Sequence, residues 1–131
     1  MKIGAPRETA KGEARVALTP ESAVHIQKLG HECLVEGGAG GAAGFSDDAY
    51  KEAGVTVVES AEKLWADAEI VIKVREPEEA EVTRLRAGQT LISFFWPAQN
   101  EAMLEAAKDT GATVIAMDMV PRISRAQKMD A

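Results

Sequence analysis

Short apolar runs alternate with longer amphipathic segments along the whole chain. The runs are rich in Val, Ile and Leu and too short for ordinary helices, so they predict strands. Their positions are 2–5, 31–36, 55–58, 70–74, 90–95 and 114–117. The run at 70–74 is the clearest buried strand, because every apolar position in it is β-branched.

Polar capping residues mark the helices between these strands. Thr19, Ser46, Ser60 and Asn100 are residue types that accept a hydrogen bond from a helix's first turn. They predict helices over 20–29, 47–53 and 101–108 and a helix after Ser60 that carries Leu64 and Trp65, and a further amphipathic segment predicts one over 77–87. Glycines follow four of these helices, as expected for left-handed terminators, at Gly30, Gly54, Gly88 and Gly111.

Alternation of strands with short helices defines the expected fold class. A strand followed by a helix of about ten residues and another strand implies a parallel sheet covered by helices on both faces. We therefore predict a doubly wound α/β fold, Rossmann-like or flavodoxin-like, with a mostly parallel sheet of five or six strands. Residues 1–131 are expected to form one domain.

Composition narrows the possible partners. The net charge of -6 argues against a general nucleic-acid binder. A single cysteine, Cys33, excludes an internal disulfide and suits a reducing compartment. No apolar run approaches the length of a membrane span, so this segment is not expected to insert into a membrane. The ending, Met129-Asp130-Ala131, has no terminal Gly, Pro or charged tail, which suggests a piece of a longer protein.

Polar side chains concentrate after the last predicted strand, in the segment 121–130. This segment holds two arginines, a serine, a glutamine, a lysine and an aspartate. Because ligands bind at the carboxyl ends of the strands in open α/β sheets, the segment is a candidate binding site. The alternative is a solvated, basic helix start after Pro121.

The glycine-rich loop at 36–47 approaches the dinucleotide motif G-x-G-x-x-G/A and follows a strand. That motif needs its last position to open a helix directly, whereas here a Phe-Ser-Asp-Asp cap intervenes. The next strand also follows too soon for the acidic residue to lie at the usual distance. We expect instead a tight connection in which glycine supplies positive φ angles.

Two cations are candidates at the same edge of the sheet. Arg15 lies in the connection after the first strand, where it could bind a carboxylate or phosphate, or form a solvated ion pair. Lys73 is set inside an apolar run and must find an anion, either a ligand or a structural carboxylate such as Glu76. No Ser/His/Asp arrangement or metal cluster is visible.

Several stretches together resemble a known family. They are 3–8, 15–20, 36–47, 73–74 and 121–130, and they span essentially the whole chain. They are similar to the amino-terminal domain shared by alanine dehydrogenase and proton-translocating nicotinamide nucleotide transhydrogenase. In alanine dehydrogenases an arginine, a lysine and a histidine of this domain serve the substrate. Arg15 and Lys73 match the first two, but Trp96 stands in place of the histidine.

Tryptophan cannot exchange a proton, so the resemblance favours the transhydrogenase α subunit. It implies the NAD(H)-binding component of an enzyme that moves hydride between NADH and NADP+, coupled to proton translocation. Arg122, Gln127 and Asp130 match residues that contact the nicotinamide end, in a cleft shared with a following Rossmann domain. Arg15 and Lys73 remain weaker candidates for cofactor contact, and no residue is expected to be an acid or base.

The same resemblance implies the surroundings of this chain. NADP(H) would be bound by another domain or subunit, and a membrane domain would belong to the same complex. A homodimer at the cytoplasmic face of the bacterial inner membrane is expected, and this piece alone would be inactive. Two alternatives stay open: the amino-terminal domain of an alanine dehydrogenase-like enzyme, and a non-catalytic dimerisation scaffold.

Overall fold

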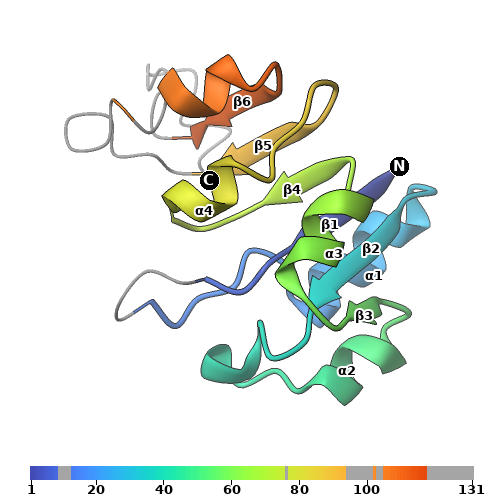
Figure 1. Cartoon of the computed structure of the whole chain (residues 1–131). Helices are drawn as coiled ribbons and strands as arrows, with labels where there is room; N and C mark the ends of the chain where they lie inside the picture. Colours follow the sequence, from blue (N-terminus) through green and yellow to red (C-terminus); the bar gives the residue numbers. More distant parts are fainter. Residues whose placement is uncertain (9–12, 76, 94–101, 103–104, 118–131) are drawn as a thin grey trace, which may run out of the picture.

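The computed structural model describes residues 1–8, 13–75, 77–93, 102 and 105–117. Its strands form one sheet in the order β3-β2-β1-β4-β5-β6, and every neighbouring pair is parallel (Figure 1). The strands are β1 (Lys2–Ala5), β2 (Glu32–Glu36), β3 (Thr56–Val58), β4 (Ile70–Ile72), β5 (Thr90–Ser93) and β6 (Thr113–Ala116). The predicted doubly wound α/β fold is confirmed.

Helices connect consecutive strands. They are α1 (Pro20–Lys28), α2 (Asp47–Glu52), α3 (Ala61–Asp67) and α4 (Glu79–Val82), with a 3-10 turn η1 (Gly41–Ala43) before α2. A further helical segment occupies 105–109. The expected caps are present, because the hydroxyls of Thr19, Ser46 and Ser60 accept backbone N–H bonds at the starts of α1, α2 and α3. Asn100 lies outside the described residues.

Two elements are shorter than the hydrophobic pattern predicts. The helix predicted over 77–87 is limited to α4, because the N–H groups of Arg84 and Leu85 bond to carbonyls three residues earlier, as in a tight turn. The strand predicted over 70–74 ends at Ile72. The Lys73 N–H still donates to the Ile92 carbonyl of β5, but the N–H groups of Val74 and Arg75 serve a carboxylate from another connection. That contact belongs to the site described below.

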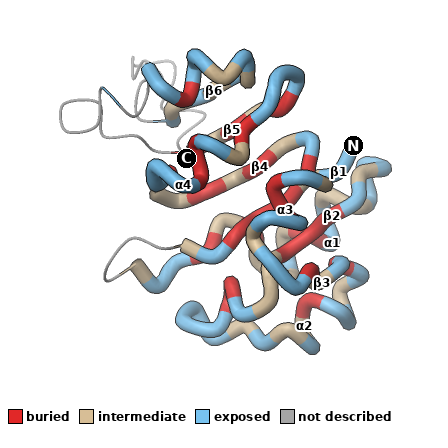
Figure 2. The backbone as a smooth tube through the Cα atoms, viewed as in Figure 1, coloured by how far each residue is buried: buried red, intermediate tan, exposed pale blue. Residues whose placement is uncertain are grey.

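Two hydrophobic cores lie on opposite faces of the sheet (Figure 2). One packs under α3 and α4, and its largest buried side chain is Trp65. The other packs under α1 and α2 around Tyr50, whose hydroxyl donates to the Leu18 carbonyl at 2.6 Å. The two cores fix the sheet between them and hold its carboxyl edge in place.

Candidate functional site

The winding of the sheet changes direction between β1 and β4. From β1 the chain continues to β2 and β3 on one side, and from β4 to β5 and β6 on the other. The connections that follow β1 and β4 therefore part at this point and leave a crevice at the carboxyl edge, where open α/β sheets bind ligands. The residues 6–8, 13–18 and 73–75 of these connections form the candidate site.

Lys73 lies buried at this point, between two carboxylates. Its side chain is 1% exposed, and its Nζ lies 3.4 Å from Glu8 Oε1 and 3.3 Å from Glu81 Oε2. The sequence predicted that this lysine needs an anion, and the structure confirms a pairing with carboxylates of the chain itself. The named candidate, Glu76, lies outside the described residues, and the partners found are Glu8 and Glu81.

Glu8 joins the two connections by more than the ion pair. Its Oε2 accepts the Val74 N–H at 2.8 Å, and its Oε1 accepts the Arg75 N–H at 3.1 Å. These two backbone donors are therefore withdrawn from the sheet, which is why β4 stops at Ile72. One carboxylate thus satisfies a buried cation and two backbone groups from a connection 65 or more residues away.

Glu81 ties α4 to the same cluster. Its Oε1 accepts the Glu78 N–H at 2.8 Å, as in a capping box, while its Oε2 faces Lys73. Burial raises the pKa of the Glu81 carboxyl, and the positive charge of Lys73 opposes that shift without cancelling it. The cluster of one lysine and two carboxylates carries a net negative charge when all three are ionised.

Arg15 is held by a separate ion pair nearby. Its Nε lies 2.8 Å and its Nη2 2.9 Å from the two oxygens of Glu13, a two-pronged contact. Hydrogen bonding from Arg15 lowers the pKa of Glu13 to about 2. Glu13 also lies 3.8 Å from Arg75, so it links the connections after β1 and β4 a second time.

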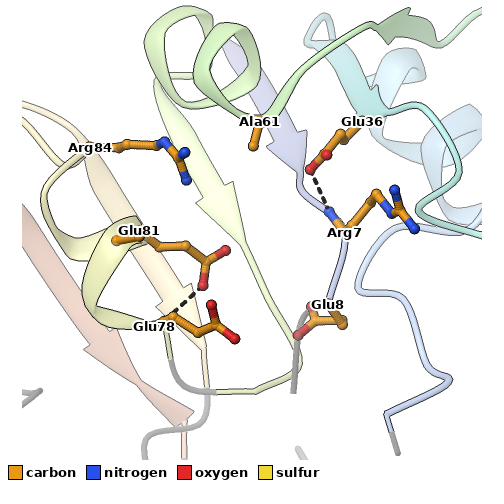
Figure 3. Close-up of a pocket in the computed structure, with 8 residues that line it drawn as sticks. Arg7, Glu8, Glu36, Ala61, Glu78, Glu81 and Arg84 are labelled. Carbon is orange, nitrogen blue, oxygen red and sulfur yellow. Dashed lines mark hydrogen bonds between the residues drawn. The ribbon is translucent and has the colours of Figure 1, made fainter. Parts of the chain in front are cut away.

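A pocket of about 360 Å³ opens beside the lysine cluster (Figure 3). The close-up shows the carboxylates of Glu8, Glu78 and Glu81 turned toward one another, with the guanidinium of Arg84 above them. The lining residues are Arg7, Glu8, Glu36, Ala61, Glu78, Ala80, Glu81 and Arg84. Arg7 and Arg84 form no ion pair with another described residue. The pocket can therefore bind ligand groups that donate hydrogen bonds, through its carboxylates, and ligand groups that accept them, through its arginines.

The predicted site residues divide into two groups. Arg15 and Lys73 both lie at the expected edge, but their environments differ: the Arg15 side chain is 68% exposed and Lys73 is buried, each with its own carboxylates. Each cation is therefore paired with carboxylates of the chain itself. Arg122, Gln127 and Asp130, as well as Trp96, lie outside the described residues.

Sequence reasoning missed the carboxylates that bind these cations. Glu81 could have been found, because it stands three residues after the N-cap Glu78 as in a capping box. Glu13, two residues before Arg15, was also within reach as an ion-pair partner. Nothing in the local pattern marks Glu8, whose contacts depend on the pairing of β1 with β4.

The glycine-rich loop is a tight connection, as predicted. Gly38 and Gly44 have φ angles of +83° and +90°, and the loop runs through η1 before α2 begins. The Gly38 N–H donates to Asp47 Oδ1, so this group serves the loop itself. A glycine turn that opens directly into a helix, as a pyrophosphate cradle requires, is not found at this loop.

Neither a metal cluster nor a membrane span is found within the part of the chain that the structure describes. No group of three or more His, Cys, Asp or Glu side chains there is arranged to hold a metal ion. No helix there is long and apolar enough to cross a bilayer.

A parallel sheet with this strand order and a polar crevice at its switch point defines an α/β domain of the Rossmann-like class. Comparison with known proteins identifies the family within that class. The sequence model of one protein family, described as "Alanine dehydrogenase/PNT, N-terminal domain", matches residues 4–131 of this chain. The chain belongs to this family.

Three relatives show how the similarity is distributed. The α subunit of the NAD(P) transhydrogenase of Cereibacter sphaeroides is 70% identical over all 131 residues, which are 25% of that protein. The alanine dehydrogenase of Halomonas elongata is 43% identical over 120 residues, covering 92% of this chain and 32% of that protein. The crystal structure of a transhydrogenase from Sinorhizobium meliloti superimposes with a TM-score of 0.87 at 34% identity, over 99% of this chain and 39% of that one.

These proportions show that the chain spans about a quarter of the length of the transhydrogenase α subunit it resembles. Its relatives are oxidoreductases, transhydrogenases and alanine dehydrogenases alike.

Proposed function

We propose that the chain is the amino-terminal part of the NAD(H)-binding component of a proton-translocating transhydrogenase. The observation that carries this proposal is the identity of 70% with a transhydrogenase α subunit, against 43% with an alanine dehydrogenase. Residues 1–131 would form one domain, and a following dinucleotide-binding domain would supply the pyrophosphate cradle that the glycine-rich loop lacks.

The ion pairs at the carboxyl edge support this choice over amino-acid oxidation. Arg15 and Lys73 match the substrate-binding cations of alanine dehydrogenases, yet Glu13 holds the first and two carboxylates hold the second. At Lys73, which is buried, a ligand carboxylate would have to displace one of these partners, at the cost of leaving a buried charge unpaired. Trp96 in place of the histidine removes the proton carrier as well.

Hydride transfer needs alignment rather than an acid or base from this chain. The nicotinamide ring supplies or accepts the hydride directly when a second ring is held in near contact. Gln127 can donate to and accept from a carboxamide, Asp130 can accept from an amide or ribose hydroxyl, and Arg122 can offset negative charge. We assign these three residues to the nicotinamide end of NAD(H).

The remaining parts of the reaction belong to other parts of the enzyme. NADP(H) would be bound by another domain or subunit, and proton passage would occur in a membrane domain of the complex. We expect a homodimer of this component at the cytoplasmic face of the bacterial inner membrane. The chain of 131 residues alone would not catalyse the reaction, because half of the nucleotide site is outside it.

Calorimetric titration of a hybrid subunit tests the proposal. In this hybrid the present chain replaces the matching quarter of the Cereibacter sphaeroides α subunit. We expect binding of NADH with little response to NADPH. Gln127→Ala and Asp130→Ala should each weaken NADH binding by roughly 1 to 3 kcal/mol, because a polar contact is lost.

Three results would contradict parts of the proposal. Equal binding of NADH and NADPH, or binding of neither, would reject the NAD(H) assignment. Reduction of pyruvate with ammonia and NADH by the hybrid would favour the alanine dehydrogenase alternative. Unchanged NADH affinity in the Gln127 and Asp130 variants would favour a scaffold role for this domain.

A further inference from the structure

The buried lysine cluster holds more negative than positive charge. Lys73 pairs with both Glu8 and Glu81, so two carboxylates share one ammonium. The two N–O distances, 3.4 and 3.3 Å, are longer than the separation of about 2.7–2.9 Å that is typical of an ammonium bonded to a carboxylate. One lysine is therefore stretched between two partners, and neither ion pair has its best geometry.

A second cation lines the same pocket. Arg84 forms no ion pair with another described residue. The close-up shows its guanidinium above the carboxylate of Glu81, and both side chains come from the same side of the pocket (Figure 3). Because both line a cavity of about 360 Å³, the Arg84 side chain has room to change its rotamer.

The backbone places Arg84 within reach of Glu81. The Arg84 N–H donates to the Glu81 carbonyl at 3.0 Å, in the tight turn that follows α4. In such a turn the side chains at positions i and i+3 lie over one another, so a rotamer change alone can bring the guanidinium to this carboxylate. The neighbouring Glu78 is exposed and is therefore a weak competitor for Arg84.

The cluster can thus adopt two arrangements. In the observed one, Lys73 serves both carboxylates, and Arg84 is half-buried without an ion pair among the described residues. In the other, Arg84 pairs with Oε2 of Glu81, and Lys73 pairs with Glu8 alone. Each carboxylate then has its own cation, but the Arg84 side chain becomes ordered and its guanidinium leaves water. Gain and cost have opposite signs, as a switch between two states requires.

A single carboxylate oxygen changes its partner in this exchange. Oε1 of Glu81 accepts the Glu78 N–H at 2.8 Å, and this bond can persist in both arrangements, so α4 keeps its capping box. Glu8 likewise keeps its two backbone donors. The contact that is lost is the ion pair between Glu81 and Lys73, which ties α4 to the connections after β1 and β4. The exchange therefore releases α4 without leaving a buried carboxylate unpaired.

We propose that Lys73 and Arg84 are alternative counter-ions of Glu81, and that their exchange is a switch that ties α4 to the carboxyl edge of the sheet or releases it. With Lys73 as the partner, α4 is fixed to both connections of the crevice. With Arg84 as the partner, Glu81 pairs within its own turn, and the crevice loses one of its internal ties. This inference goes beyond the proposed function and does not depend on it.

A double-mutant cycle tests the exchange. Lys73→Met, Arg84→Met and their combination are made in the 131-residue chain, and urea unfolding gives the unfolding equilibrium constant of each. When Lys73 is lost, Arg84 should take over Glu81 and offset part of the cost, although Glu8 still lacks a cation. Lys73→Met should therefore raise the unfolding constant about tenfold more in the Arg84→Met background than in the native one.

Arg7→Met is the matched control. Arg7 lines the same pocket and also forms no ion pair with a described residue, but it lies in the connection after β1 and not in the turn that carries Glu81. Its loss should leave the effect of Lys73→Met unchanged. Equal effects of Lys73→Met with and without Arg84 would overturn the proposal. An equal excess in the Arg7→Met background would assign the coupling to the general charge of the pocket, and would overturn it too.

A second measurement decides the question if the double variant does not fold. Carbon-13 NMR titration of the Glu81 carboxyl needs only the native chain and the single variants. Burial raises the pKa of this carboxyl, and the charge of Lys73 opposes the shift. A second cation that spends part of its time at Glu81 opposes it as well, so Arg84→Met should raise this pKa further, whereas Arg7→Met should not. An unchanged pKa in the Arg84→Met chain would exclude the exchange.

Discussion

Lys73 shows how one buried side chain organises a polar edge. Moving a single ammonium out of water is costly, and two carboxylates at 3.3 and 3.4 Å offset that cost. The same carboxylates also accept the backbone N–H groups of Val74, Arg75 and Glu78, so the lysine stabilises the shape of two connections at once. The contribution of Lys73 to the stability of the fold is best measured by a substitution that removes its charge.

Lys73→Met should destabilise the fold by about 3–5 kcal/mol, because it leaves two buried carboxylates without a cation. The matched control is Lys63→Met on α3, an exposed lysine whose loss should change stability by about 0.5 kcal/mol or less. Urea unfolding of the chain measures both. Equal midpoints for the two variants would show that the lysine cluster contributes little.

Glu13 gives the domain a stability that depends on acid. Its pKa is about 2 in the folded chain and 4.5 as an ordinary glutamate, so its contribution is present above pH 4.5 and is lost as the pH falls toward 2. Glu13→Gln should flatten this part of the stability profile, measured by urea unfolding at several pH values. Glu59→Gln, at an exposed site, should leave the profile unchanged.

Glu81 should act with the opposite sign. Burial raises its pKa in the folded chain, so its favourable contribution exists below the ordinary value of 4.5 and is lost as the pH rises through its folded pKa. At neutral pH, Glu81→Gln should therefore lower the free energy of unfolding by less than the removal of one partner from an ordinary buried ion pair does. The loss caused by this substitution should be larger at acid pH than at neutral pH, and urea unfolding at several pH values that showed the reverse would contradict this sign.

At the residue scale, the sequence predicts that a buried charge needs a counter-charge better than it predicts which residue supplies it. A lysine within a β-branched run must find an anion, and this expectation is correct. Its partner Glu8 cannot be identified by spacing, because the two residues are 65 positions apart and meet only when β1 pairs with β4. Arg122, Gln127 and Asp130 remain predictions.

Among the elements, the glycine-rich loop shows most clearly the difference between a motif and its structure. Its sequence approaches a dinucleotide motif, but its backbone packs against the core around Tyr50. A Cβ at Gly40 would lie 2.6 Å from the Tyr50 ring and 2.9 Å from the Phe45 Cβ. The glycine at this position is required for close packing.

Gly40→Ala should therefore cost about 1–3 kcal/mol, because the Tyr50 ring must shift in a packed core. Gly41→Ala is the matched control, since a Cβ there would meet nothing within 4 Å. Thermal unfolding of the two variants gives the difference. If Gly41→Ala instead weakened NADH binding in the hybrid subunit without loss of stability, the loop would contact the nucleotide.

Strand and helix lengths reveal the limit of periodicity. The pattern predicts a strand to residue 74 and a helix to residue 87, since apolar spacing continues through both. Tertiary contacts end them earlier: Glu8 removes two N–H groups from the ladder, and the Gln89 side chain accepts the Arg86 N–H in the turn that follows α4. Hydrophobic spacing contains no information about either acceptor.

For the whole molecule, the alternation of elements was enough to predict a parallel sheet covered by helices, and the structure confirms it. The strand order does not follow from the hydrophobic pattern, because apolar strands of similar length do not specify their neighbours.

The position of β1 has a consequence for biosynthesis. This strand is made first, yet it lies between β2 and β4 in the finished sheet. Its ladder with β2 can form once residue 35 has left the ribosome, whereas its other edge waits for residues 70 and 71. During that interval the nascent chain exposes an unpaired, apolar strand edge. The time that residues 36 to 70 take to emerge from the ribosome therefore sets how long this edge is open to wrong partners.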